Sequence, residues 1–147
     1  MKISIRNLEH DDFFKGYLTL LSQLSVLEPN KIIKRDFDNF VNNLNTLHQV
    51  IVANDIEGEI IGSMTVIFEQ KVIHNFGKVC HIEDVVVDKN TRGYGIGKHL
   101  IEHAINIATK NGCYKVILDC SEENIPFYNK CNFEKRGAYM YHKINII

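Results

Sequence analysis

The feature that most constrains the fold is the stretch from Val79 to Leu100, where an apolar run, a polar turn and a glycine-rich loop follow one another. Residues Cys80 to Val87 predict a buried strand, and Arg92 to Gly97 form a loop that leads into an amphipathic helix. Glycines at a strand-to-helix junction let a ligand approach main-chain N–H groups that have no partner inside the helix. The stretch therefore predicts an anion site, most naturally one for a diphosphate.

The loop matches neither of the two standard phosphate motifs. It contains no Gly-x-x-x-x-Gly-Lys-Ser/Thr, and Gly93, Gly95 and Gly97 lack the Gly-x-Gly-x-x-Gly spacing. A glycine-rich turn without a ligand is the alternative interpretation. The flanking strand and helix favour the ligand site.

The segment after the loop completes a strand, helix and strand unit. The predicted helix ends at Asn111-Gly112, and Tyr114 to Cys120 predict a second strand. The apolar face of this helix is formed by Leu100, Ile101, Ala104, Ile105 and Ala108. Such a unit is normally a right-handed crossover between parallel strands. Ser121 or Asn124 can then cap a short helix that carries Phe127 and Tyr128.

The first half predicts a strand around Ile3 and Ile5, two amphipathic helices and a β-hairpin. The first helix carries Phe14, Tyr17, Leu18, Leu21 and Leu24 and is capped by Asp11 or Asp12, and the second carries Ile33, Phe37, Phe40, Val41 and Leu44. The hairpin pairs Val50 to Ala53 with Glu59 to Phe68. Residues Phe133 to Ile147 alternate in a way that predicts one or two antiparallel strands. The whole pattern predicts one α/β domain over residues 1–147, with helices on the faces of a single mixed sheet.

Charge and composition narrow the classes of function. Seventeen basic and eighteen acidic residues give a formal charge of −1, so no net field would recruit nucleic acid or an anionic membrane. No apolar run is long enough to cross a bilayer, and the N-terminal residues lack a signal peptide's apolar core, so we expect a soluble, cytoplasmic protein. The four cysteines form no C-x-x-C pair, which favours free buried thiols over a zinc site.

Several blocks resemble the glucosamine-6-phosphate N-acetyltransferase branch of the GNAT superfamily. They are Lys71 to His74, His81 to Val87, Arg92 to Lys98, Cys113 to Cys120 and Asn124 to Cys131. The order Arg92-x-x-Gly95-x-Gly97 resembles the superfamily's acyl-CoA motif, and the other blocks point to the branch. The resemblance implies a mostly antiparallel sheet with about four helices, acetyl-CoA as co-substrate and no metal. It also implies a homodimer with sites at the interface. The implied reaction lies on the route to UDP-N-acetylglucosamine.

The resemblance also implies where acetyl-CoA binds. Val85, Val86 and Val87 would pair with the pantetheine amides as an added strand does. The diphosphate would be held by Arg92, Gly93, Tyr94, Gly95, Ile96, Gly97 and Lys98. Tyr128, Asn129 and Lys130 would complete the cofactor contacts. The alternative for the valines is simple burial in a sheet.

The resemblance places the chemistry on four residues. Glu83 and Asp84 would lie at the sugar site, where one holds the amine or takes its proton through water. As neighbours on a strand they point to opposite faces unless a bulge intervenes, and the alternative is one surface and one structural carboxylate. Asp119 would reach the amino group through its side chain or its carbonyl. Tyr128 would lie near the CoA sulfur, and core packing is its alternative role.

A sugar phosphate needs local cations because the net charge is close to zero. Lys71, Val72, Ile73 and His74 match the branch's substrate segment. Lys143 stands where the branch more often has Arg, and a Lys supplies a point charge in place of a bidentate fork. Ser22 or Gln23 stands near a threonine contact of the branch, in a stretch that reads equally well as plain loop. Taken one at a time, Lys71 and Lys143 would be solvated surface charges and His74 an ordinary polar residue.

Two other functions compete with acetylation of glucosamine 6-phosphate. A GNAT enzyme could act on a protein N-terminus, a polyamine or an aminoglycoside, but such cationic acceptors usually meet acidic grooves, which Lys71, His74 and Lys143 argue against. A non-catalytic acyl-CoA-binding module would bind without turnover, and the presence of Tyr128 and Glu83-Asp84 disfavours it.

Overall fold

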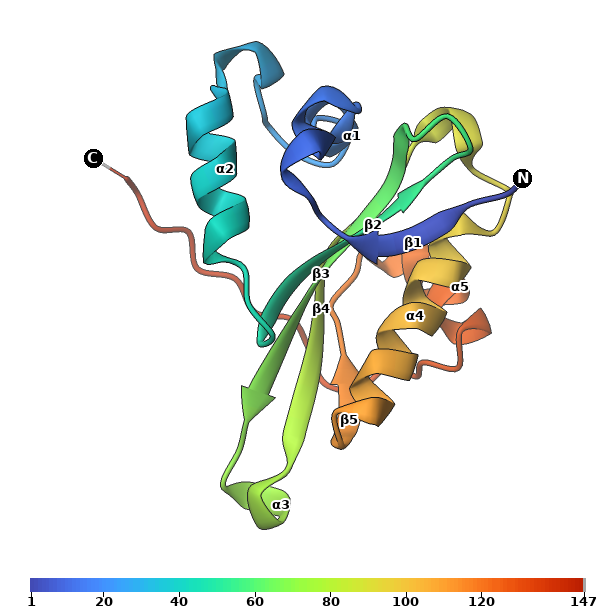
Figure 1. Cartoon of the computed structure of the whole chain (residues 1–147). Helices are drawn as coiled ribbons and strands as arrows, with labels where there is room; N and C mark the ends of the chain where they lie inside the picture. Colours follow the sequence, from blue (N-terminus) through green and yellow to red (C-terminus); the bar gives the residue numbers. More distant parts are fainter. Residues whose placement is uncertain (147) are drawn as a thin grey trace.

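The computed structural model describes residues 1–146, in which helices pack on both faces of one five-stranded sheet (Figure 1). The strands are β1 (Ser4–Asn7), β2 (His48–Asn54), β3 (Ile60–Gln70), β4 (Lys78–Val87) and β5 (Cys113–Ile117). They lie side by side in chain order, and only the last pair, β4 and β5, is parallel. The predicted mixed, mostly antiparallel sheet with its central hairpin is confirmed.

The helices follow the expected order with some short additions. The α-helices are α1 (Tyr17–Leu21), α2 (Lys34–Asn43), α3 (Ile73–Phe76), α4 (Ile96–Lys110) and α5 (Ile125–Lys130). The 3-10 turns are η1 (His10–Phe14), η2 (Pro29–Lys31), η3 (Lys89–Thr91) and η4 (Glu122–Asn124). Within residues 1–146, none of these helices is both long and apolar enough to cross a bilayer.

Each face of the sheet has its own hydrophobic core. On one face the apolar side of α4, with Leu100, Ile101 and Ala104 fully buried, packs against the strands. On the other face Tyr17 of α1 and Phe37 of α2 close a second cluster. The helical periodicity of the sequence therefore identified the buried face of α4. In α2 it was right for Phe37, which is buried, but Ile33 and Phe40 are 48% and 40% exposed.

The first predicted helix is not continuous. Gly16 has φ +80, a left-handed conformation that breaks the segment into η1 and α1. As a result Phe14 is 71% exposed and Leu24 is 43% exposed, so neither belongs to the buried face that the sequence predicted. Glu9 is the capping position in place of Asp11 or Asp12, and Asp12 is its partner three residues on.

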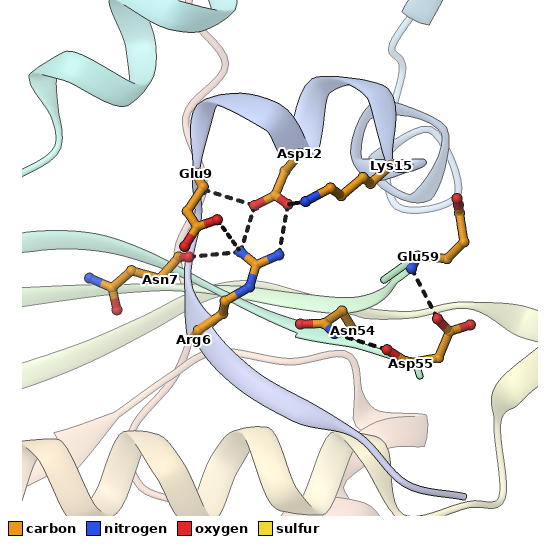
Figure 2. Close-up of polar contacts among 8 residues, drawn as sticks. All are labelled: Arg6, Asn7, Glu9, Asp12, Lys15, Asn54, Asp55 and Glu59. Atoms are coloured by element: carbon orange, nitrogen blue, oxygen red, sulfur yellow. Dashed lines mark hydrogen bonds and ion pairs between the residues drawn. The ribbon is translucent and has the colours of Figure 1, made fainter. Parts of the chain in front are cut away.

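A buried carboxylate joins β1 to this first turn (Figure 2). The two terminal guanidinium nitrogens of Arg6 donate to the carboxylate oxygens of Asp12, each at 2.8 Å, and the main-chain N–H of Glu9 donates to the same group at 2.8 Å. Asp12 has no exposed surface, so this pairing is what allows a charge to be buried there. The network fixes the entry into α1, which lines one side of the site.

The tail differs from its prediction. Residues 133–146 form no strand, and Tyr139, Tyr141 and Ile144 are all more than 60% exposed. Alternation produces a strand only where a neighbouring edge is available to pair with, and the tail pairs with none within residues 1–146. Ile147, the last residue of the predicted strands, lies outside the described residues.

The cysteines are free thiols, as the sequence predicted. Cys80 and Cys131 are buried, whereas Cys113 and Cys120 are only half-buried. Burial raises the pKa of the Cys80 thiol to about 12. Cys80 is therefore a packing residue of the core.

Candidate active site

Strand β4 has one edge that is only partly covered. On one side β3 pairs with it as far as Val87, whereas on the other side the pairing with β5 ends at His81 opposite Ile117. From Ile82 onward, no strand among residues 1–146 covers this second edge, so its main-chain groups can pair with an extended ligand. The predicted cofactor contacts Val85 to Val87 lie in this open part.

A β-bulge interrupts β4 beside the open edge. Asp84 and Val85 together lie opposite the single residue Met64 of β3. Asp84 has φ +53, in the left-handed region that a residue other than glycine rarely adopts. The bulge removes the strict alternation that would otherwise send the side chains of Glu83 and Asp84 to opposite faces. Strain of this kind is typical of functional sites.

The three predicted carboxylates lie close enough to affect one another. Burial raises the pKa of Glu83, and the negative charges of Asp119 and then Asp84 raise it further. Asp119 follows the end of β5 by two residues and is exposed. The raised pKa makes the carboxylate of Glu83 a stronger base than that of an ordinary glutamate, which suits it to accept a proton.

The glycine-rich loop ends in an uncapped helix. Gly95, with φ +78, is the residue before α4, no side chain caps the first turn, and no acidic residue lies in that turn. The main-chain N–H groups at this end therefore face outward with the positive end of the helix dipole. Arg92 and Lys98 add exposed positive charge on either side. This is the arrangement that the sequence predicted for a diphosphate.

Helix α5 packs closely against the start of α4. A methyl group added to Gly97 would lie 3.1 Å from the ring of Phe127, so a larger residue would push this ring away by a few tenths of an ångström. The ring of Tyr128 meets that of Phe127 edge-on at 4.9 Å. Burial, with smaller effects from nearby thiols and Asp119, raises the pKa of Tyr128 to about 12, so its hydroxyl stays protonated and can donate. Asn129 and Lys130 are exposed at the end of α5.

The predicted phosphate-binding segment lies far from this cluster. Lys71 follows the end of β3 and is paired with Glu69 at 3.1 Å, while His74 stacks on Tyr114 at 4.2 Å. Gln70, the residue before Lys71, pairs with Lys78 at the start of β4. Glu83 lies five residues further along β4, so at about 3.3 Å per residue it is roughly 17 Å from this pair. One chain therefore does not bring Lys71 and His74 to Glu83.

The tip that carries this segment is strained and apolar. His74, Asn75 and Phe76 all have positive φ, although none is glycine. Val72 is 75% exposed, Phe76 71% and Ile73 62%. Three successive left-handed residues and exposed apolar side chains are features that a surrounding partner usually maintains.

The remaining predicted substrate contacts are scattered. The hydroxyl of Ser22 donates to the carbonyl of Thr19 at 2.6 Å, and it is exposed at the end of α1. Lys143 is exposed in the irregular tail. Neither residue meets the Glu83 cluster through a contact within the chain.

The structure adds a cavity that the sequence did not reveal. It has a volume of about 280 Å³ and lies between α1, α2 and the sheet, with Asp84 among its walls. Its other polar walls include Tyr17, Ser63 and Thr65. Burial, opposed by the hydrogen bond with Ser63, raises the pKa of Tyr17 to about 12. The one signal for this cavity in the sequence is Tyr17, a tyrosine within an otherwise apolar helix face.

No three His, Cys, Asp or Glu side chains gather within residues 1–146 in a way that could hold a metal ion. The groups that the structure places at the site are carboxylates, a neutral tyrosine, main-chain N–H groups and nearby basic residues.

Comparison with known proteins gives one consistent result. The sequence pattern of the acetyltransferase (GNAT) family matches residues 3–133. Glucosamine 6-phosphate N-acetyltransferase 1 of Dictyostelium discoideum is 42% identical over 139 residues, which cover 94% of this chain and 88% of that protein. Glucosamine 6-phosphate N-acetyltransferase of Candida albicans is 36% identical over 141 residues, covering 93% of each chain.

A solved structure agrees along the whole chain. The crystal structure of glucosamine-6-phosphate N-acetyltransferase from Arabidopsis thaliana superposes with a TM-score of 0.93 at 36% identity and covers 99% of this chain and 100% of the other. An acetyltransferase from Trypanosoma brucei superposes with a TM-score of 0.82 at 33% identity, over 97% of this chain and 100% of the other.

Proposed function

The chain belongs to the GNAT family of acetyltransferases, and we propose that it transfers the acetyl group of acetyl-CoA to the amine of D-glucosamine 6-phosphate. The products are N-acetyl-D-glucosamine 6-phosphate and CoA. The observation that carries the proposed reaction is the open edge of β4, which leads through the glycine loop into the uncapped start of α4. The phosphorylated amino sugar is proposed as acceptor because relatives of that name match this chain along nearly its whole length. Both substrates are charged metabolites, so the proposal includes a cytoplasmic site for the reaction.

In this proposal the main chain binds the donor. The N–H groups of residues 93–98 hold the diphosphate at the positive end of α4, with Arg92 and Lys98 beside it. The open edge of β4 at Val85 to Val87 pairs with the pantetheine arm as an added strand does. An N–H group of the same edge points at the thioester carbonyl, where negative charge develops as the amine attacks.

In this proposal the side chains accept and donate the protons of the reaction. Glu83, whose pKa is raised, takes the proton of the attacking amine directly or through water, and Asp119 and Asp84 hold the amino sugar in place. Tyr128, whose hydroxyl stays neutral, donates to the departing sulfur. Because a thiol has an ordinary pKa of about 8.5, its thiolate leaves without full protonation, and Tyr128 assists moderately.

The acceptor's phosphate requires cations that one chain does not place at the site. We therefore include a homodimer in the proposal, with Lys71 and His74 of one copy completing the site of the other. The strained, exposed tip at Val72 to Phe76 and the exposed apolar tail support this arrangement, because a second copy would bury both. Lys143 lies on that tail and is a candidate for the same role.

A thiol-release assay tests the proposed function. Purified protein is mixed with acetyl-CoA and, in separate reactions, glucosamine 6-phosphate, glucosamine, spermidine or a peptide with a free N-terminus. We expect rapid release of CoA thiol with glucosamine 6-phosphate and much slower release with the others. Release with the peptide or spermidine but not with the sugar phosphate would overturn the assignment. Binding of acetyl-CoA without release for any amine would indicate a non-catalytic module.

A further inference from the structure

One side chain links the two halves of the site directly. Gln23 follows α1, at the start of an irregular, exposed segment that runs to η2. Its amide nitrogen donates to the carboxylate of Asp88 at 3.2 Å, and its amide oxygen accepts the main-chain N–H of Lys89 at 3.0 Å. The two contacts span 65 and 66 residues of sequence. They therefore join two parts of the chain that are far apart in the sequence.

The far end of this link is the turn from β4 into the glycine loop. Asp88 donates its N–H to the carbonyl of Ile61 at 2.9 Å and caps η3 by accepting the N–H of Asn90 at 3.1 Å. Its carbonyl accepts the N–H of Thr91 at 2.9 Å. Asp88 is thus fixed to the sheet, and Arg92 begins the loop four residues later. A side chain attached to Asp88 is attached to the base of that loop.

The near end of the link borders the acceptor side. The segment after Gln23 contributes Leu27 to the cavity, and α1 before it contributes Leu18 and Leu21. Asp84 lies among the walls of the same cavity. Few other contacts hold this segment, since Val26 is 99% exposed and Leu24 43%. The amide of Gln23 is therefore well placed to set the position of the segment relative to the glycine loop.

We infer that Gln23 is a positioning residue that couples the two ligand sites by holding the segment after α1 to the turn before the glycine loop. Binding of the diphosphate restrains the glycine loop next to this fixed turn, and Gln23 joins the turn to the acceptor side, so each ligand binds more tightly when the other is present. A carboxamide suits this role because it offers one donor and one acceptor, and both are used here. The inference rests on the proposed function for the identity of the acceptor.

The test is a set of variants measured by calorimetry with CoA, in the presence and absence of glucosamine 6-phosphate. Gln23→Ala removes both hydrogen bonds, and Gln23→Asn is too short to reach either partner. We expect both to weaken CoA binding about fivefold when the sugar phosphate is present and by less when it is absent. In steady-state kinetics the KM for acetyl-CoA should rise while kcat changes less than about twofold.

A swapped pair distinguishes positioning from general stability. Gln23→Glu places a carboxylate against Asp88 and should weaken CoA binding by about tenfold or more. Adding Asp88→Asn restores a donor and an acceptor in exchanged positions, so the double variant should regain most of the affinity. Gln49→Ala is the matched control, because Gln49 lies on β2 away from the site, where its side chain donates to the carbonyl of Thr46 and accepts from the side chain of Asn7.

Two results would overturn the inference. One is that Gln23→Ala and Gln23→Asn leave both the CoA affinity and its dependence on the sugar phosphate as in the wild type. The other is that the double variant is no better than Gln23→Glu. If the wild type binds CoA but never acetylates glucosamine 6-phosphate, the proposed function fails. The effect of Gln23 on the KM for acetyl-CoA can then still be measured with whichever amine is accepted.

Discussion

Tyr128 shows how a single residue at this site combines packing with chemistry. Its ring lies edge-on between Phe127 and Phe133, while burial raises the pKa of its hydroxyl to about 12. The sequence left core packing and proton donation as alternatives, and these contacts are compatible with both. A substitution that keeps the ring separates them.

Tyr128→Phe should lower kcat by about tenfold, because the departing sulfur loses a donor but can leave as a thiolate. The dissociation constant of acetyl-CoA, measured by calorimetry, should change less than about threefold, since the ring remains. Equal loss of kcat and of acetyl-CoA affinity would reduce Tyr128 to a packing residue.

At the scale of single residues, the sequence predicted which carboxylates gather but not the backbone conformation at Asp84. The carboxylates at positions 83, 84 and 119 were predicted at the site, and the structure brings them together. The bulge at Asp84 could not be predicted, because it depends on the register between β3 and β4, and that register is set by packing across the sheet. The sequence does not indicate the link made by Gln23, because its two hydrogen-bond partners lie 65 and 66 residues away.

At the scale of elements, the Arg6 and Asp12 pair holds β1 to the turn before α1 (Figure 2). Asp12→Ala should lower the free energy of unfolding by about 3 kcal/mol, the lower part of the range for a buried pair, because Arg6 keeps 25% of its side chain exposed. Chemical denaturation measures the change. Asp11→Ala is the control, since Asp11 is the exposed neighbour in the same turn. An equal effect of the two substitutions would contradict this role for the pair.

The same pair gives a pH dependence with a definite sign. Burial raises the pKa of Asp12, but the hydrogen bonds from Arg6 and the Glu9 N–H, with the nearby positive charges, outweigh it and lower the pKa overall. The contribution to stability is therefore complete above the ordinary aspartate pKa, about 3.9, and is lost as the pH falls through the lowered value. The difference between wild type and Asp12→Ala should shrink in acid.

The glycine loop allows a matched comparison between two left-handed glycines. Gly95 has φ +78 before α4, and Gly58 has φ +91 in the turn between β2 and β3; an added methyl group meets no close atom at either position. Gly95→Ala and Gly58→Ala should each lower the free energy of unfolding by about 1 kcal/mol. Only Gly95→Ala should weaken CoA binding, because it shifts the N–H groups that hold the diphosphate. Equal CoA affinity in the two variants would contradict the proposed site.

The elements themselves were predictable where periodicity and flanking residues agreed. Helix α4 and strand β4 have long, regular patterns and lie next to each other in sequence, so local signals were sufficient. The break at Gly16 and the irregular tail were missed for different reasons. Gly16 acts through its backbone conformation, and the tail alternates like a strand but pairs with no strand among residues 1–146.

At the scale of the whole molecule, the proposed site is divided between regions that one chain keeps roughly 17 Å apart. If each site takes Glu83 from one copy and Lys71 from the other, Glu83→Gln and Lys71→Ala should each lower activity alone. Mixing equal amounts under conditions in which subunits exchange should restore about a quarter of wild-type activity, because half of the dimers then contain one intact site. Mass spectrometry of the mixture verifies the exchange. No recovery among exchanged dimers would contradict the shared site.

The most direct test of the account is a crystal structure with both CoA and glucosamine 6-phosphate bound. We expect the diphosphate within hydrogen-bond distance of the N–H groups of residues 93–98, and the pantetheine arm paired along β4 from Glu83 to Val87. The sugar amine should lie beside Glu83 and Asp119. Coenzyme A bound elsewhere, or the edge of β4 filled by the chain's own residues 133–146, would contradict the account.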